Sequence, residues 1–168
     1  MNEQIEELLK EFGEESTPTR RVLERIPEQH LLWKPHPTST PMGILAMHVA
    51  TVPGQLANAL QKDEIDSGAG EGFTQSPEAV PQILTAFDRS EDDFESWIRH
   101  VDDRTLKGVW RLCHGAKVLI SRPRLEIIRR VVFNHRYHHR GQLTVYLRML
   151  GVPVPAIYGP SGDENPFQ

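Results

Sequence analysis

The sequence has 168 residues, about the length of one domain, so we expect a single domain over residues 1–168. Its 19 Lys and Arg against 23 Asp and Glu, a formal net charge of −4, argue against nucleic-acid binding, which needs a clustered basic excess. Cys113 is the only cysteine, which excludes an internal disulfide and a thiolate metal cluster and favours a reducing cytoplasm. The sequence contains neither a signal-peptide pattern nor an apolar run long enough to span a membrane.

Apolar residues recur at spacings of three and four, the period of an amphipathic helix, in four segments of the chain. We therefore predict helices over residues 2–26, 40–61, 76–101 and 123–150. Thr40 followed by Pro41 is a typical helix start, and Gly151 is a typical stop after the fourth helix. The predicted fold class is all-α, and four helices with one buried stripe each favour a four-helix bundle.

The connections before and after the third predicted helix differ in character. Residues 62–76 are rich in Gly and predict a surface loop, whereas VWRLC and KVLIS within 102–122 favour a short β-hairpin turning at His114-Gly115-Ala116. Such a hairpin is stable only if it lies against the helices. Ser121 and Pro123 then start the fourth helix, and the basic residues around Arg136 and Arg140 are interpreted as its solvated face.

Two histidines, His135 and His139, fall in the apolar stripe of the fourth predicted helix. Residues at i and i+4 lie one turn apart on one face, so both imidazoles reach a single ion. The H-x-x-x-H pattern is also common by chance, and two ordinary histidines hydrogen-bonded to their neighbours are the alternative interpretation. The neighbouring His138 is interpreted as a flanking residue, because it points about 100° away around the helix.

A third histidine, His48, falls in the apolar stripe of the second predicted helix, so only tertiary packing brings it near the other two. Burying three imidazoles without partners would cost roughly 1–3 kcal/mol for each unsatisfied group. One divalent ion bound by all three would remove most of this penalty. Three neutral nitrogen ligands suit zinc or nickel, and we therefore predict a metal site formed by His48, His135 and His139.

Three stretches of the chain resemble the DinB-like superfamily, namely LLWKPHP, LAMHVATVP and NHRYHHRGQLTVYLRMLGVPVPAIYG. The H-x-x-x-H-R-G-Q-x-x-x-Y-L-R string is specific to that superfamily, and the resemblance extends from Trp33 to Tyr158. It implies an up-down-down-up four-helix bundle that forms a homodimer. It also implies a nickel or zinc ion held by one histidine of the second helix and two of the fourth, which here are His48, His135 and His139.

The resemblance also bears on activity, because some members of the superfamily are thiol-dependent transferases or isomerases that use bacillithiol, mycothiol or glutathione. Three protein ligands leave a coordination position for water or substrate. We therefore expect a metal-dependent transferase that acts on a small molecule with a low-molecular-weight thiol as cosubstrate. A metal-dependent hydrolase with activated water and a non-catalytic, metal-stabilised binding module are the alternatives.

Three further residues are candidates for the surroundings of the metal site. Gln142 follows His139 by three positions and either faces the site or forms a hydrogen bond in the core. Trp33 and Tyr158 either line the mouth of a pocket or only pack against the bundle. No residue of the sequence stands out as a general acid or base beside the metal.

Overall fold

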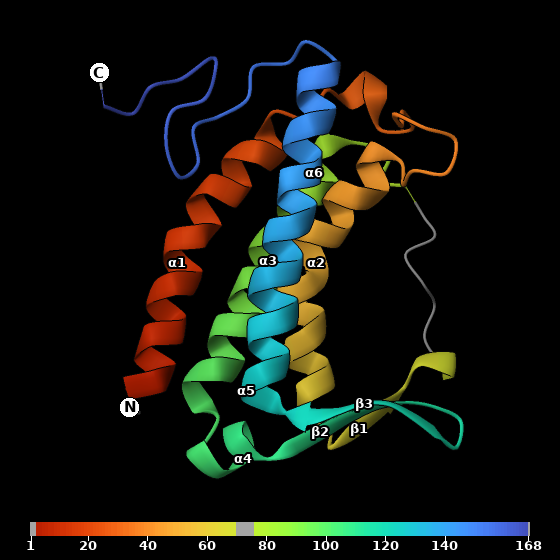
Figure 1. The fold of residues 1–168 in the computed structure, drawn as a ribbon, viewed down its shortest axis with the longest axis vertical. Coiled ribbons are helices and arrows are strands. Elements are labelled where there is room, and N and C mark those ends of the chain that lie inside the picture. Colours follow the sequence, from red (N-terminus) through yellow and green to blue (C-terminus); the bar gives the residue numbers. More distant parts are fainter. Residues whose placement is uncertain (1–2, 70–75, 168) are drawn as a thin grey trace.

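The computed structural model describes residues 3–69 and 76–167, and most of this chain is helical (Figure 1). The long helical segments lie lengthwise beside one another and are α1 (Glu3–Glu24), α2 (Met42–Leu60), α3 (Val80–His100) and a continuous stretch from Arg124 to Met149. In the view of Figure 1, α1 and the last stretch run upward, while α2 and α3 run downward. The predicted all-α class therefore describes most of the chain, with a small sheet added at the lower end.

The last helical stretch consists of three consecutive pieces. They are α5 (Arg124–Ile127), the π-helix η3 (Ile128–His135) and α6 (Arg136–Met149). A π-helix has a wider turn than an α-helix, and it is rare in proteins. Two short 3₁₀ turns, η1 (Glu28–His30) and η2 (Ser67–Ala69), lie in the loops on either side of α2.

The sheet contains three strands in the order β1-β2-β3. The predicted hairpin is confirmed as β2 (Val109–His114) and β3 (Lys117–Pro123), which pair antiparallel. Gly115 occupies the turn with φ +55°, a conformation that favours glycine. The third strand, β1 (Glu64–Asp66), pairs parallel with β2. It lies within residues 62–76, which were predicted to form a loop. Residues 70–75 of that segment lie outside the described residues.

Several predicted helix starts are wrong by a few residues. Pro41 rather than Thr40 occupies the N-cap of α2, and no side chain caps that helix. Ala79 precedes α3, so Ser76 lies outside it, and Ser121 belongs to β3 instead of capping the fourth helix. A short helix that was not predicted, α4 (Asp103–Lys107), begins where the carboxylate of Asp102 accepts a hydrogen bond from the Thr105 backbone N–H.

The end of α6 is confirmed at Gly151. This glycine has φ +69°, and the backbone N–H of Val152 donates to the Leu147 carbonyl while that of Gly151 donates to Arg148. These two bonds form a Schellman motif, which satisfies the last carbonyls of the helix.

Two apolar clusters form the core, and polar residues separate them on the helices. The cluster near the sheet includes Phe12, Leu60 and Phe94, whereas the cluster at the opposite end includes Leu23, Phe87 and Leu143. The residues between the clusters form a polar layer, which we define as Glu15, Ser16, Thr19, His48, Ser90, Glu91, His135, Arg136, His139 and Arg140.

The C-terminal tail packs against the apolar cluster that contains Leu23, Phe87 and Leu143, and two carboxylates of the tail anchor it. Asp163 pairs with Arg148 and accepts the backbone N–H of Val154, and these contacts lower the pKa of its carboxyl. Glu164 accepts the backbone N–H of Ala156 and pairs with Arg21 of α1 and with Arg25 just after that helix, and these contacts lower the pKa of its carboxyl. Both carboxylates are therefore held in their charged form, the form that anchors the tail.

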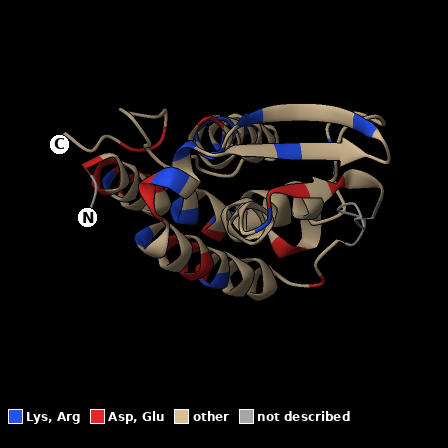
Figure 2. Cartoon of the chain, turned by 90° about the horizontal axis from the view of Figure 1, so that it is seen from below, with Lys and Arg blue, Asp and Glu red and all other residues tan. Residues whose placement is uncertain are grey.

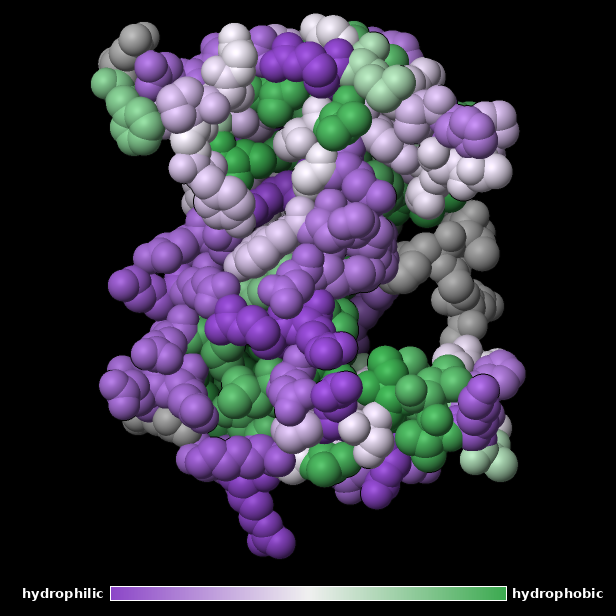
Figure 3. Space-filling view, viewed as in Figure 1, coloured by the Kyte–Doolittle hydropathy of each residue, from purple (hydrophilic) through white to green (hydrophobic). Residues whose placement is uncertain are grey.

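The surface carries mixed charges and one apolar patch. Figure 2 shows acidic and basic residues interspersed along the helices, with basic residues on β2 and β3 and acidic residues on β1. Large exposed apolar side chains gather over the sheet in Figure 3, and they belong to Val109, Val118, Leu119 and Ile120. Within the described residues, each helix is too short or too polar to cross a bilayer.

Close packing of α2 on α3 depends on Gly54. Its backbone N–H donates to the Ser90 hydroxyl at 2.8 Å, and a Cβ at this position would lie 3.0 Å from the Ser90 Cα. Such a contact is with backbone, which cannot rotate away as a flexible side chain can. The absence of a side chain at Gly54 therefore sets the separation of the two helices beside the polar layer.

We predict that Gly54→Ala lowers the free energy of unfolding by about 1–3 kcal/mol, because the added methyl forces the helices apart. The matched control is Gly13→Ala in α1, where nothing lies within 4 Å of the added Cβ. That substitution should raise stability by about 0.5–1 kcal/mol through the better helix propensity of alanine. Urea denaturation measures both changes. Equal stability of Gly54→Ala and the wild type would contradict the close approach.

Candidate metal centre

The structure brings the three predicted histidines together from two helical segments. His48 lies on α2, His135 is the last residue of η3, and His139 lies in the first turn of α6. The Nε2 atom of His135 is 2.9 Å from that of His139 and 3.5 Å from that of His48. The possible ligand atoms of all three side chains lie within 4.8 Å of one another, so this group could hold a metal ion.

Two of the separations between these nitrogen atoms are close to those of a tetrahedral site. A zinc–nitrogen distance of about 2.0–2.1 Å at tetrahedral angles places two ligand nitrogens about 3.3 Å apart. The two observed separations, 2.9 and 3.5 Å, lie on either side of that value. The His48 ring stands nearly perpendicular to those of His135 and His139, with interplanar angles of 85° and 78°, so the rings approach without stacking face to face.

The surroundings of His48 and His135 favour the neutral form of both imidazoles. Burial, together with the neighbouring His139 and His135, lowers the pKa of His48 to about 4. Burial and the adjacent histidines also lower the pKa of His135. Both rings are therefore unprotonated at neutral pH, which is the form in which imidazole binds a metal. The residues present thus fit a borderline divalent ion such as zinc or nickel.

The neighbours of the cluster on α6 have separate roles. The Nδ1 atom of His139 lies 2.6 Å from the Oε1 atom of Gln142, so Gln142 contacts the centre directly. His138 is exposed, and its ring lies 5.0 Å from that of His139 without joining the three-histidine cluster. Its interpretation as a flanking residue therefore agrees with its position.

A cavity of about 310 Å³ lies against the cluster. It is lined by Thr40, Ile44, Leu45, His48 and His139. Two of its walls are apolar side chains of the first turns of α2, and one is the hydroxyl-bearing Thr40. The sequence did not single out Thr40, Ile44 or Leu45 as neighbours of the site, although Ile44 and Leu45 precede His48 by four and three positions on its own helix face.

Trp33 and Tyr158 are not among the residues that line this cavity. Trp33 packs edge-on against Tyr146 at 5.6 Å, and the Tyr146 hydroxyl donates to the carbonyl of Thr40, so Trp33 supports the cavity wall indirectly. Tyr158 is mostly exposed and donates its hydroxyl hydrogen to Glu15. It also accepts a hydrogen bond from Arg140, beside α1.

A comparison with known protein families identifies the family of the chain. The family model described as the DinB family matches residues 1–165. The chain belongs to the DinB family. It is 21% identical over 169 residues to protein YrdA of Bacillus subtilis (strain 168), covering 98% of this chain and 93% of that protein.

Two crystal structures of DinB-like proteins have the same fold as this DinB-family chain. One, from Bacillus cereus ATCC 10987, has a TM-score of 0.73 at 22% identity, covering 91% of this chain and 97% of the other. The second, YjoA of Bacillus subtilis, has a TM-score of 0.67 at 17% identity, covering 90% of this chain and 97% of the other. At these identities the likeness shows the fold alone.

The interpretation of Arg136 and Arg140 as part of a solvated face is wrong. Their side chains are 1% and 2% exposed. Their charges are tolerated in the core because each guanidinium pairs with a carboxylate on a facing helix. Arg136 pairs with Glu91 of α3 at 2.8 Å, and Arg140 pairs with Glu15 of α1 at 2.7 Å. The α6 helix of this DinB-family protein thus places arginines in the core and histidines beside them.

The π-helix explains why the arginines occupy the core positions. In an α-helix, each residue is rotated by about 40° around the axis relative to the residue four positions before it. Residues at every fourth position therefore rotate progressively away from the core. The wider turn of η3 reduces this rotation. Ile128, Val132 and Arg136, spaced by four, are consequently all buried, whereas His135 is half-buried and turned toward α2.

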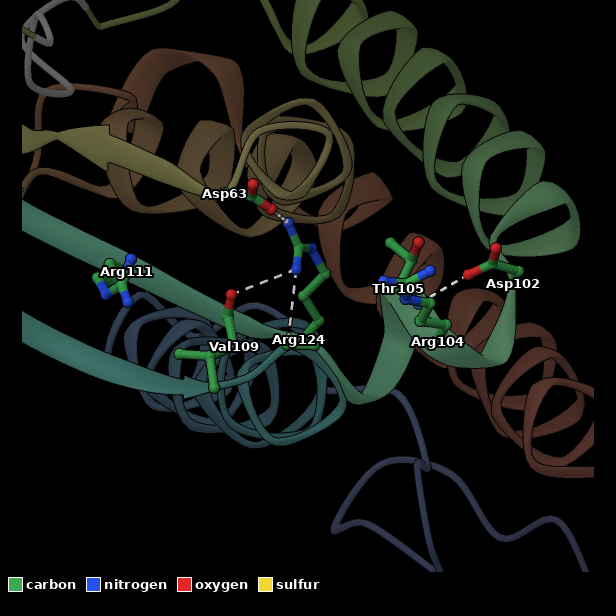
Figure 4. Close-up of a pocket in the computed structure, with 8 residues that line it drawn as sticks. Asp63, Asp102, Arg104, Thr105, Val109, Arg111 and Arg124 are labelled. Carbon is green, nitrogen blue, oxygen red and sulfur yellow. Dashed lines mark hydrogen bonds and ion pairs between the residues drawn. The ribbon is translucent and has the colours of Figure 1, made fainter.

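A larger cavity, of about 520 Å³, lies at the sheet end of the molecule and contains none of the three histidines. Arg124, which is 4% exposed, forms part of it and pairs with the carboxylate of Asp63 (Figure 4). It also donates to the carbonyls of Leu60, the last residue of α2, and of Lys62 just after it. Arg124 therefore caps that helix, and its buried charge has a structural role.

The buried pair of Arg136 and Glu91 generates a stability prediction. Burial raises the pKa of the Glu91 carboxyl, although Arg136 opposes the change. The desolvation penalty of the two charged groups therefore offsets much of the stabilisation from their mutual attraction. Glu91→Ala leaves a buried guanidinium without its carboxylate, and we expect the free energy of unfolding to fall by about 3–5 kcal/mol. The double variant Arg136→Met with Glu91→Leu should recover most of that loss, because no buried charge remains.

Thermal and urea unfolding of the two variants and the wild type measure these changes. Lys10→Ala with Glu14→Ala, a pair exposed on α1, is the control and should change stability by less than about 1 kcal/mol. A Glu91→Ala variant as stable as this control would show that the pair does not stabilise the fold.

Proposed function

We propose that this protein binds one zinc or nickel ion through His48, His135 and His139 and acts as a transferase that uses a low-molecular-weight thiol. The observation that carries the proposal is the convergence of three imidazole nitrogen atoms beside a cavity. Three protein ligands leave at least one coordination position for another molecule. Because the cavity borders His48 and His139, a molecule bound in it lies next to the proposed ion.

The chemistry requires a nucleophilic sulfur near neutral pH. A bound divalent ion lowers the pKa of a thiol that it contacts, so that the thiolate prevails. In the transfer, the sulfur forms a bond to an electrophilic carbon, the bond from that carbon to its leaving group breaks, and the thiol proton passes to solvent. The side chains of Ile44 and Leu45 contribute an apolar wall that restricts water near the reacting atoms.

The lining of the cavity favours a thiol over water as the nucleophile. Among the described residues that line it, none is a carboxylate that would take a proton from water. A free thiol has a pKa of about 8.5 and loses its proton far more readily than water does. A thiol cosubstrate therefore needs less assistance from the protein than hydrolysis would.

We predict that the purified wild type binds one zinc or nickel ion per chain and that His48→Ala and His135→Ala each abolish most of this binding. His138→Ala is the matched control, because His138 is an exposed histidine next to the cluster. Competition with a chromophoric chelator measures the affinities, and elemental analysis measures the stoichiometry. A wild type that stays metal-free at saturating zinc and nickel would refute the metal site.

The transferase step is tested on the metal-loaded protein with a chromogenic aryl halide and a panel of low-molecular-weight thiols. We expect turnover that depends on the thiol, persists in His138→Ala and is lost in His135→Ala. Turnover of ester or amide reporters without thiol would contradict this proposal and support the hydrolase alternative. Metal binding that raises the melting temperature, without turnover of any reporter, would instead support a non-catalytic module.

A further inference from the structure

The side chain of Gln142 makes a short polar contact to the three-histidine cluster from outside it. Its Oε1 atom lies 2.6 Å from the Nδ1 atom of His139. Residues three apart on a helix are neighbours on its surface, so the backbone of α6 places the amide beside the ring. Both side chains are half-buried, which limits competition from water for this hydrogen bond.

The direction of this hydrogen bond determines which nitrogen of His139 is protonated. An amide oxygen only accepts hydrogen bonds, so the Nδ1 atom of the neutral ring must carry the proton. The Nε2 atom then has a free lone pair, and it is the atom that faces His135 at 2.9 Å. Gln142 therefore both selects the tautomer of His139 and fixes the rotation of its ring.

The other histidine of the same helical stretch lacks such support. The Nδ1 atom of His135 is buried, and no described residue forms a hydrogen bond with it. Its Nε2 atom lies close to the Nε2 atoms of both His139 and His48. Because the unprotonated Nε2 of His139 can only accept, the 2.9 Å contact requires His135 to donate from its own Nε2. Of the two histidines, only His139 is thus already in the tautomer that binds a metal through Nε2.

We infer that Gln142 is a positioning residue of the metal centre, which holds His139 as the preformed ligand. This inference rests on the proposed metal site. A hydrogen bond to the second nitrogen of a metal-binding imidazole orients the ring and raises its basicity, and losing such a bond typically weakens metal binding by about 10–100-fold. The neutral amide of Gln142 provides this orientation without adding a negative charge near the ion.

The inference is tested with Gln142→Leu, which keeps the bulk and removes the acceptor, and with Gln142→Glu, which keeps an acceptor at the same distance. We expect the dissociation constant for zinc to rise by about 10–100-fold in Gln142→Leu and to stay at or below the wild-type value in Gln142→Glu. Thr144→Ala is the control, because Thr144 lies on α6 and bonds only to the carbonyl of Gly141. Its affinity for zinc should equal that of the wild type.

Two measurements separate positioning from folding. Melting of the metal-free variants, followed by circular dichroism, should show equal stability of Gln142→Leu and Thr144→Ala. Nitrogen-15 NMR of the metal-free protein should show His139 protonated at Nδ1 in the wild type and in Gln142→Glu. If Gln142→Leu does not fold, this spectrum of the wild type and the zinc affinity of Gln142→Glu decide the question.

The possible failures are distinguishable. A wild type that binds no zinc refutes the proposed metal site and this inference with it. A wild type that binds zinc while Gln142→Leu binds it equally well overturns only the positioning role. A wild-type His139 protonated at Nε2, or a Gln142→Glu variant as weak as Gln142→Leu, would also overturn that role.

Discussion

The structure depends on a polar layer that must satisfy its own charges and hydrogen bonds between two apolar clusters. Buried guanidinium groups are costly unless a carboxylate meets them, and here Arg136 and Arg140 each meet one from a different helix. Because Glu91 belongs to α3 and Glu15 to α1, these pairs fix the rotation of α6 relative to both helices. This rotation in turn decides which way the intervening histidines point.

The histidines form the second part of the layer. His135 and His139 turn toward α2 because the neighbouring arginines occupy the core positions, and His48 meets them from the opposite side. Gly54 sets the separation of α2 and α3, so the same layer also depends on helix packing. The three imidazoles held this way form a donor set for a metal ion, and the adjoining cavity lies next to it.

Much of this arrangement can be predicted from the sequence, because periodic apolar residues indicate the long helices and place His48 and the pair on α6 in their stripes. The hairpin and the stop at Gly151 follow from turn chemistry in the same way. The burial of Arg136 could not be predicted, since it depends on the wider turn of η3 and on a partner 45 residues earlier in the chain. One signal was available, because Glu91 stands at an inward position between Phe87 and Phe94.

The central claim is that one metal ion occupies the point at which three imidazoles meet. A crystal structure of the zinc-loaded protein, with anomalous diffraction recorded at the zinc edge, tests it most directly. We expect a single strong anomalous peak within about 2.0–2.1 Å of the Nε2 atoms of His48, His135 and His139. A peak that contacts only exposed histidines elsewhere on the surface, or no peak at this point in fully loaded crystals, would contradict it.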